Sequence, residues 1–162
     1  MYWTTIQTLH HDPAEQEDLK VKIVNIYIAT DSKNTRKSKR KFGYVLECEL
    51  AGNPYTKEGF GEVETTYNGA ILIAINKALE RLNFCCEVHI HTENGFVANM
   101  IENNLDTWAG ADFKTKKGKP VVNQEEWKKL WEQSQKNLII MAAGRHSYSN
   151  WIEEQMKGQD DV

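Results

Sequence analysis

Two apolar segments of the sequence each end in a carboxylate. Residues 22–30 are rich in β-branched side chains and are followed by Asp31, and residues 86–92 are followed by Glu93. A helix entered at Asn150 carries two more acids. Asp is also a good turn residue, so Asp31 taken alone is better explained as a turn at the end of a strand than as a ligand. Strand-end acids together with an acidic helix indicate a functional site at one edge of a sheet.

The positive charge of the chain is concentrated in two short segments. Residues 33–41 carry six Lys or Arg and no acid, and residues 114–119 carry four Lys, out of 20 in the chain. The formal net charge is −3, so the rest of the chain carries −3 − 10 = −13. The segments could be solvated loops that keep the protein soluble. A basic patch on an acidic body would instead attract phosphate-sized groups locally, unlike the generally basic surface of a non-specific binder.

Length and composition are those of one globular domain. The chain has 162 residues, of which 40% are hydrophobic and 27% charged. No apolar run reaches the roughly 20 residues of a membrane span, and no secretory signal is evident. Three cysteines, two of them adjacent, fit a reducing compartment. We therefore expect a monomer of the cytoplasm with no membrane contact: an extension over 1–20, one domain over 21–158, and a tail over 159–162.

Hydrophobic periodicity predicts five strands and four helices. The strands are expected over 22–30, 42–50, 57–64, 86–92 and 138–142. The helices are expected over 68–82, 94–103, 123–135 and 149–157, and 104–120 is expected to be a loop. Three consecutive strands with short links predict an antiparallel meander, and the later strands alternate with helices.

This order resembles the ribonuclease H family, and in particular the ribonuclease HI-like members. Thr65-Thr66-Tyr67-Asn68 is similar to the family's helix entry, and Thr92-Glu93-Asn94-Gly95-Phe96-Val97 to its second acidic motif. The stretch with Trp108, Phe113-Lys114-Thr115 and Gly118-Lys119-Pro120-Val121 resembles a long, compositionally unusual family segment. The resemblance covers about 22–157. It implies an α/β fold with a five-stranded mixed sheet, three strands antiparallel and then two parallel, flanked by helices.

The resemblance also implies a chemistry, hydrolysis of the RNA strand of RNA–DNA hybrids through two divalent ions held by four carboxylates. Two ions roughly 4 Å apart can stabilise both the attacking and the leaving oxygen, and carboxylates suit Mg²⁺ or Mn²⁺. Carried over by position, Asp31, Glu93 and Glu154 are the expected metal ligands and catalytic acids. The fourth position, on the 68–82 helix, is Ile71, which belongs to an apolar stripe. Glu62 or Glu64 could reach the site instead.

Further contacts follow from the same resemblance. His146 is similar to a catalytic histidine of the loop before the last helix, but it lies closer to Asn150 than the family spacing requires. Glu153 is expected at the surface. The expected nucleic-acid contacts are polar and basic residues at the strand ends and helix entries: Ser32, Lys37, Lys39, Arg40, Thr66, Asn68, Asn94 and Asn150. The alternative function is a catalytically silent ribonuclease H-like module that binds nucleic acid or a protein partner.

Overall fold

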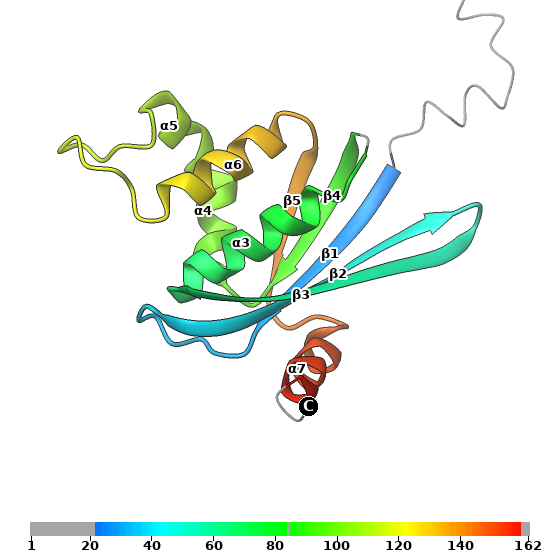
Figure 1. The fold of residues 1–162 in the computed structure, drawn as a ribbon. Helices are drawn as coiled ribbons and strands as arrows, with labels where there is room; N and C mark the ends of the chain where they lie inside the picture. The colour runs from blue at the N-terminus through cyan, green and yellow to red at the C-terminus, as the bar shows by residue number, and fades with distance from the viewer. Residues whose placement is uncertain (1–21, 84, 160–162) are drawn as a thin grey trace, which may run out of the picture.

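The computed structural model describes residues 22–83 and 85–159, and the fold is reported for these ranges (Figure 1). The predicted extension over 1–20 and residues 160–162 of the predicted tail lie outside them. Among the described residues, no helix is long and apolar enough to cross a membrane.

A single five-stranded sheet forms the centre of the molecule. Its strands lie in the order β3-β2-β1-β4-β5. β1 pairs antiparallel with β2 and β2 with β3, whereas β4 is parallel to both β1 and β5. The predicted mixed sheet is therefore confirmed. The strand bounds are Lys22–Thr30 (β1), Ser38–Leu50 (β2), Asn53–Thr65 (β3), Cys86–Thr92 (β4) and Leu138–Ala143 (β5).

Helices cover the two faces of the sheet unequally. Figure 1 shows α3, α4, α5 and α6 on one face and α7 on the other. Hydrophobic contacts agree, because one core cluster joins the sheet to α3–α6 and a smaller one joins it to α7. The helix bounds are Tyr67–Leu79 (α3), Gly95–Asn103 (α4), Leu105–Gly110 (α5), Gln124–Ser134 (α6) and Ser149–Gly158 (α7).

The alternation of side chains along β1 explains why both faces are covered. Ile26 and Ile28 point into the larger core, while Tyr27 and Ala29 point toward α7 and the smaller core. Because β1 and β4 are parallel, with Tyr27 opposite His91, their carboxyl ends meet at one edge of the sheet. Topology alone therefore brings the two strand-end acids to the same edge.

Regular structure extends further than predicted at the starts of β2 and β3 and within residues 104–120. β2 begins at Ser38 rather than residue 42, because the basic residues pair with acidic ones on β3, for example Lys39 opposite Glu64. β3 correspondingly begins at Asn53 rather than residue 57. The predicted loop 104–120 contains α5, which is held by Trp108 packing edge-on against Trp127 at 4.9 Å between ring centroids.

Gly43 on β2 allows α7 to approach the sheet closely. A Cβ atom there would lie 2.6 Å from Ile152 Cγ2 and 2.7 Å from Phe60 Cε1. Ile152 is fully buried. The rotation of α7 is thus set by tight packing, and this decides which of its acids faces the strand ends.

Candidate functional site at the strand ends

Asp31 follows β1 and is held by the start of β2. Its backbone N–H donates to Lys41 O at 3.1 Å, and its Oδ1 accepts from Lys41 N at 3.0 Å. The residue is exposed. Asp31 therefore lies at the predicted edge with one carboxylate oxygen engaged by the backbone.

Glu93 follows β4 and is paired with two cations. Lys33 Nζ lies 2.7 Å from Oε2, and Arg145 Nη1 lies 2.9 Å from Oε1. Burial raises the pKa of the carboxyl group, but the hydrogen bond and charge of Lys33, with those of Arg145, outweigh it, so the pKa lies below its usual range. Glu93 is therefore ionised and already charge-balanced.

Arg145 extends this cluster to α7. Its guanidinium lies 3.1 Å from Glu153 Oε1 and 3.5 Å from Glu153 Oε2, and it donates to Asn150 Oδ1. The Lys33–Glu93–Arg145–Glu153 cluster thus joins the loop after β1, the end of β4 and α7. Arg145 precedes the last helix in the sequence. A search of the sequence for cations that could balance the strand-end acids would have included it as a candidate.

The structure corrects the placement expected for the two acids of α7. Glu154 pairs with Lys157 at 3.6 Å, its side chain is 71% exposed, and the cluster contains Glu153 instead. Successive helix residues turn by about 100°, and buried Ile152 and Met156 orient α7. Glu153 lies beside this buried stripe, whereas Glu154 points to the opposite side. Asn150 contacts the cluster through Arg145.

No acidic side chain occupies the fourth expected ligand position. Ile71 is 2% exposed and belongs to the larger core, as the apolar stripe predicted. Glu62, one of the alternative acids, instead pairs with Lys39 at 2.8 Å. Glu64 lies on β3, the strand at the far side of β2 from β1.

His146, in the loop before α7, packs against the sheet. Its Nε2 lies 2.7 Å from Ile28 O, which can only accept, so Nε2 carries the proton and Nδ1 accepts from Tyr148 N at 3.3 Å. The ring also lies against Tyr27. Burial lowers the pKa of His146. Proton transfer to a substrate would require one of these bonds to break.

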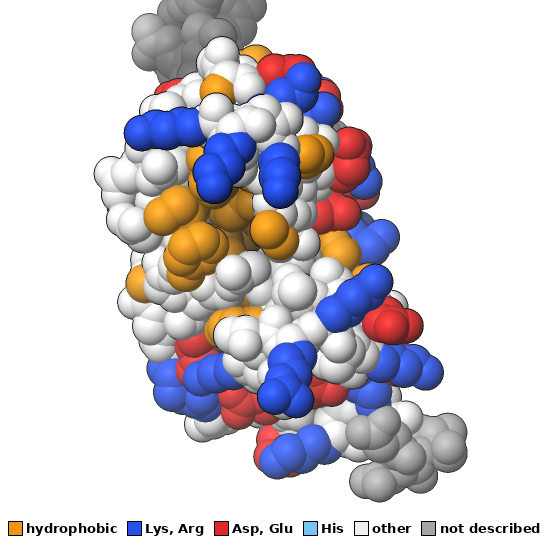
Figure 2. All heavy atoms as spheres, turned by 90° about the vertical axis from the view of Figure 1, so that its left-hand side faces the viewer, with side chains coloured by type: hydrophobic (Ala, Val, Ile, Leu, Met, Phe, Trp, Pro, Cys, Tyr) orange, Lys and Arg blue, Asp and Glu red, His pale blue; other side chains and the backbone are white. Residues whose placement is uncertain are grey.

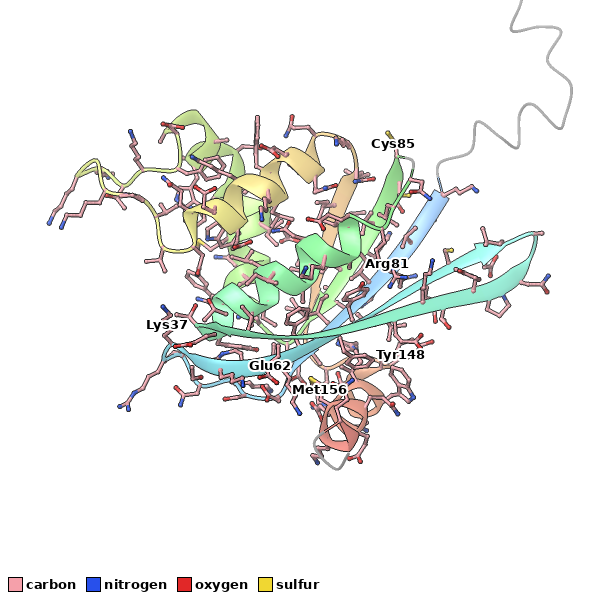
Figure 3. All side chains as sticks on the ribbon, in the orientation of Figure 1. Lys37, Glu62, Arg81, Cys85, Tyr148 and Met156 are labelled. Atoms are coloured by element: carbon pink, nitrogen blue, oxygen red, sulfur yellow. The ribbon has the colours of Figure 1, made fainter. Side chains whose placement is uncertain are left out.

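Tyr148 and Tyr27 share an acceptor beneath the sheet. Tyr148 Oη donates to Glu47 Oε2 at 2.9 Å, and Tyr27 Oη to Oε1 at 3.4 Å. Figure 3 shows Tyr148 and Met156 on the α7 side of the sheet. These contacts fix the loop that carries Arg145 and His146.

Arg40 is a structural residue rather than an exposed phosphate contact. It is 1% exposed, and its guanidinium donates to the carbonyl groups of Thr65, Ser32 and Arg36 and to Ser38 Oγ. Arg40 lies on the buried side of β2 with its guanidinium engaged by the protein, so a direct nucleic-acid contact by this side chain stays a prediction that would require these bonds to break.

The neighbouring lysines of the same segment differ from Arg40. Lys37 is exposed at the tip of the loop (Figure 3), and Lys39 is exposed although it pairs with Glu62. Ser32 organises the turn, since its Oγ accepts from Asn34 N and its carbonyl from Arg40. Lys37 and Lys39 therefore remain available as phosphate contacts.

The polar residues at the helix entries meet. Thr66 caps α3 by accepting from Gly69 N, and Asn94 caps α4 by accepting from Val97 N. Asn94 Nδ2 donates to Asn68 Oδ1 at 2.7 Å, which joins the two helix starts. Asn94 is 4% exposed and Asn68 is half-buried. Of this pair, Asn68 is the more accessible to a ligand.

A groove of about 430 Å³ opens between the strand ends and α7. It is lined by Thr30, Asp31, Lys33, Lys41, Glu153, Met156 and Lys157. Figure 2, viewed from the left-hand side of Figure 1, shows Lys and Arg side chains spread around an apolar area, with Asp and Glu side chains at the bottom and along the right-hand side. In Figure 1 the 33–41 and 114–119 segments both extend to this side.

The residues at the strand ends do not fit a pair of divalent ions. Of the four expected acids, Asp31 has one oxygen engaged, Glu93 carries two ion pairs, Glu154 is turned away and the fourth is Ile71. In the described ranges, no group of three or more His, Cys, Asp or Glu is placed to hold a metal ion. Mg²⁺ needs several oxygen ligands in near-octahedral geometry, which these side chains do not provide.

Comparison with known proteins identifies the family. A family model described as RNase H matches residues 16–148, most of the chain. The chain belongs to the ribonuclease H family. The match ends before α7, so it does not extend to Glu153 or Glu154.

Individual relatives of this ribonuclease H-family chain match over part of their length. A ribonuclease HI of Xylella fastidiosa is 35% identical over 79 residues, covering 49% of this chain and 53% of the relative. A ribonuclease H of Nitrosospira multiformis is 36% identical over 91 residues, covering 56% and 59%. The chain thus spans little more than half the length of these relatives.

Solved structures share the fold. LC9-RNase H1, described as a type 1 RNase H with the type 2 active-site motif, matches with a TM-score of 0.69 and 16% identity, over 88% of this chain and 72% of that one. The foamy viral protease-reverse transcriptase in complex with RNA/DNA hybrid matches with a TM-score of 0.64 and 18% identity, over 88% and 20%. At these identities the likeness concerns the fold alone.

Proposed function

We propose that the chain binds nucleic acid, with an RNA–DNA hybrid as the expected ligand, at the groove between the strand ends and α7. The observation that carries the proposal is the charge of this groove, where Lys33, Lys41 and Lys157 lie beside two acids. Lysines attract the phosphate backbone without reading sequence. Asp31 and Glu153 in the same groove repel phosphate. The attraction is therefore confined to the positions of the lysines.

Two basic segments extend the proposed surface beyond the groove. Lys37, Lys116 and Lys117 are exposed and lie on the segments that reach the same side of the molecule. Phosphates along one duplex could contact both segments. Family membership supports the proposal, and so does the fold shared with a reverse transcriptase that was solved in complex with RNA/DNA hybrid.

Fluorescence anisotropy with labelled hybrid at several salt concentrations tests the proposal. Replacing Lys37, Lys116 and Lys117 by Gln should weaken binding and flatten the plot of log affinity against log salt, by up to about 0.9 per lost contact. The matched control replaces Lys57, Lys77 and Lys136 by Gln. These lysines are also exposed but lie away from the two basic segments. Equal effects of the two triple variants would contradict the proposed surface.

A second candidate function is hydrolysis of the RNA strand of the hybrid, the two-metal reaction that the resemblance implies. The one observation in its favour is that Asp31 and Glu153 line the same groove. Because the side chains as placed do not fit two ions, this reaction would require Glu93 to leave its ion pairs with Lys33 and Arg145. Incubation of labelled hybrid with Mg²⁺ or Mn²⁺ tests it, with Asp31→Asn as the control for contaminating nuclease. The variant Ile71→Glu restores an acid at the fourth position. Hybrid left intact by both wild type and a folded Ile71→Glu variant would support a binding module without cleavage.

A monomeric state and a cytoplasmic location remain part of the proposal. Sedimentation of the purified chain, with and without hybrid, tests the first. Fractionation of cells that express the chain tests the second.

A further inference from the structure

Both carboxylate oxygens of Glu93 are ion-paired with side chains of the same chain. Oε2 is 2.7 Å from Lys33 Nζ and Oε1 is 2.9 Å from Arg145 Nη1. The Glu93 side chain is only 14% exposed, while the two cations are 62% and 52% exposed. The acid is therefore fixed in the protein, and the cations reach it from the solvent side.

Arg145 also balances the acid of α7. It contacts both oxygens of Glu153, at 3.1 and 3.5 Å, and donates to Asn150. The Lys33–Glu93–Arg145–Glu153 cluster thus holds two negative and two positive charges. Converging carboxylates repel each other unless a cation lies between them, and here the protein supplies the cations.

A divalent ion at this place would meet two obstacles. It would lie beside Lys33 and Arg145, whose positive charges repel it, and it could reach Glu93 only if their ion pairs broke. Buried Ile71 offers no oxygen ligand from α3. The cations thus occupy the place where an ion would neutralise the acids.

We infer that Arg145 and Lys33 take the charge-balancing place of divalent ions at the strand ends, so that this site is complete without metal. The inference concerns charge balance within the folded chain and stands whether or not the chain binds nucleic acid. It also makes a positive prediction: removal of the two cations should turn the remaining acids into a site that responds to Mg²⁺ or Mn²⁺.

Thermal unfolding at constant ionic strength tests this inference without nucleic acid. Wild type should have the same Tm in EDTA, in Mg²⁺ and in Mn²⁺. The double variant Lys33→Gln/Arg145→Gln should have a lower Tm in EDTA, because Glu93 and Glu153 lose their partners. Mn²⁺ should then raise its Tm by several degrees, because an ion that binds only the folded state stabilises it.

A matched control separates the cluster from a general effect of lost cations. The variant Lys39→Gln/Lys114→Gln also removes two cations and leaves Glu62 and Asp112 unpaired, at ion pairs outside the groove. Its Tm should show no response to Mn²⁺. A response equal to that of Lys33→Gln/Arg145→Gln would overturn the inference.

Two further outcomes would overturn the inference. One is a Tm of wild type that rises with Mn²⁺, and the other is a folded double variant that shows no metal response. If the double variant does not fold, Mn²⁺ can be titrated into wild type while amide signals are observed by NMR. Broadening centred on Thr92–Asn94 would contradict the inference, and unchanged signals there would support it.

Discussion

Arg145 Nη1 lies 2.9 Å from Glu93 Oε1, so a residue of the loop before α7 is bound to the end of β4. The two residues are 52 positions apart in the chain. The same guanidinium contacts Glu153 of α7. The position of α7 therefore depends on charge at the strand ends as well as on the apolar contacts of Ile152 and Met156.

Replacing Glu93 by Gln should destabilise the protein. A hydrogen bond to a charged group contributes about 1.5–3 kcal/mol, so we expect a loss of about 1–3 kcal/mol in the free energy of unfolding at pH 7. Glu62→Gln is the control, because Glu62 forms an exposed pair with Lys39, and such pairs contribute about 0–1 kcal/mol. Urea denaturation measures both, and equal losses would contradict the account of the cluster.

Glu93→Gln should also change how the free energy of unfolding depends on pH. The folded-state pKa of Glu93 lies below the unfolded value of 4.5. Its contribution is complete above pH 4.5 and is lost as pH falls through the folded-state pKa, because the unfolded state then binds more protons. The stability difference between wild type and Glu93→Gln should therefore shrink steadily below pH 4.5. A difference that stays constant down to acid unfolding would refute this assignment.

Mild acid should weaken the packing of the loop before α7. Burial lowers the pKa of both His146 and His91 below the ordinary value of 6.5, so the folded state holds both rings neutral. As pH falls below 6.5 the unfolded state binds protons first, and stability falls until the folded-state pKa values are reached.

The variant His146→Gln removes one of these titrations while an amide N–H can still donate to Ile28 O. Its urea midpoint should fall less than that of wild type between pH 7.5 and 5.5. NMR titration of the imidazole signals provides the direct measurement, with midpoints expected below 6.5. A midpoint for His146 at or above that value would be inconsistent with its burial.

Introducing a carboxyl group at Ile71 should be costly. The side chain is 2% exposed in the larger core, and an unpaired buried charge is destabilising. We expect Ile71→Glu to lose about 3–5 kcal/mol at pH 7, against less than about 1.5 kcal/mol for Ile71→Leu. The cost should decrease as pH falls, because a buried carboxyl group has a raised pKa and is protonated early. Equal losses for the two variants would indicate an open site beneath α3.

Arg40 and Lys37 should behave differently although both belong to the same basic segment. Arg40→Gln removes buried hydrogen bonds that tie the 32–38 turn to β3, and we expect a loss of about 2–4 kcal/mol, more than one bond to a charged group is worth. Lys37→Gln should change stability by at most about 0.5 kcal/mol, as is usual at an exposed position. Urea denaturation distinguishes them. Hybrid binding should be affected directly only at Lys37.

Local sequence pattern was sufficient for the five strands, for α3, α4, α6 and α7, and for one feature of the site. The period of two in β1 and the helical stripe through Ile71 depend on neighbours in the chain, so strands, helices and the core position of Ile71 could be predicted. The ends of β2 and β3 could not, because the first residues of β2 are stabilised by partners on another strand. Helix α5 could not be predicted for a similar reason, because it is stabilised by Trp108 packing against Trp127 on α6.

The charges of the site were decided by the tertiary structure. Whether Glu153 or Glu154 faces the strand ends depends on the rotation of α7, which is set by Ile152 packing against Gly43. Successive residues of a helix are rotated by about 100°. Glu153 therefore lies in the site, while Glu154, one residue later, faces solvent. Arg40 is buried because of the face of β2 on which it lies, although its neighbours along the chain are exposed. Arg145 meets Glu93 because β4 and β5 are parallel neighbours, with Thr92 opposite Ala143, so the residues that follow the two strands lie at the same edge of the sheet. Such a contact between distant segments cannot be read from a local sequence pattern.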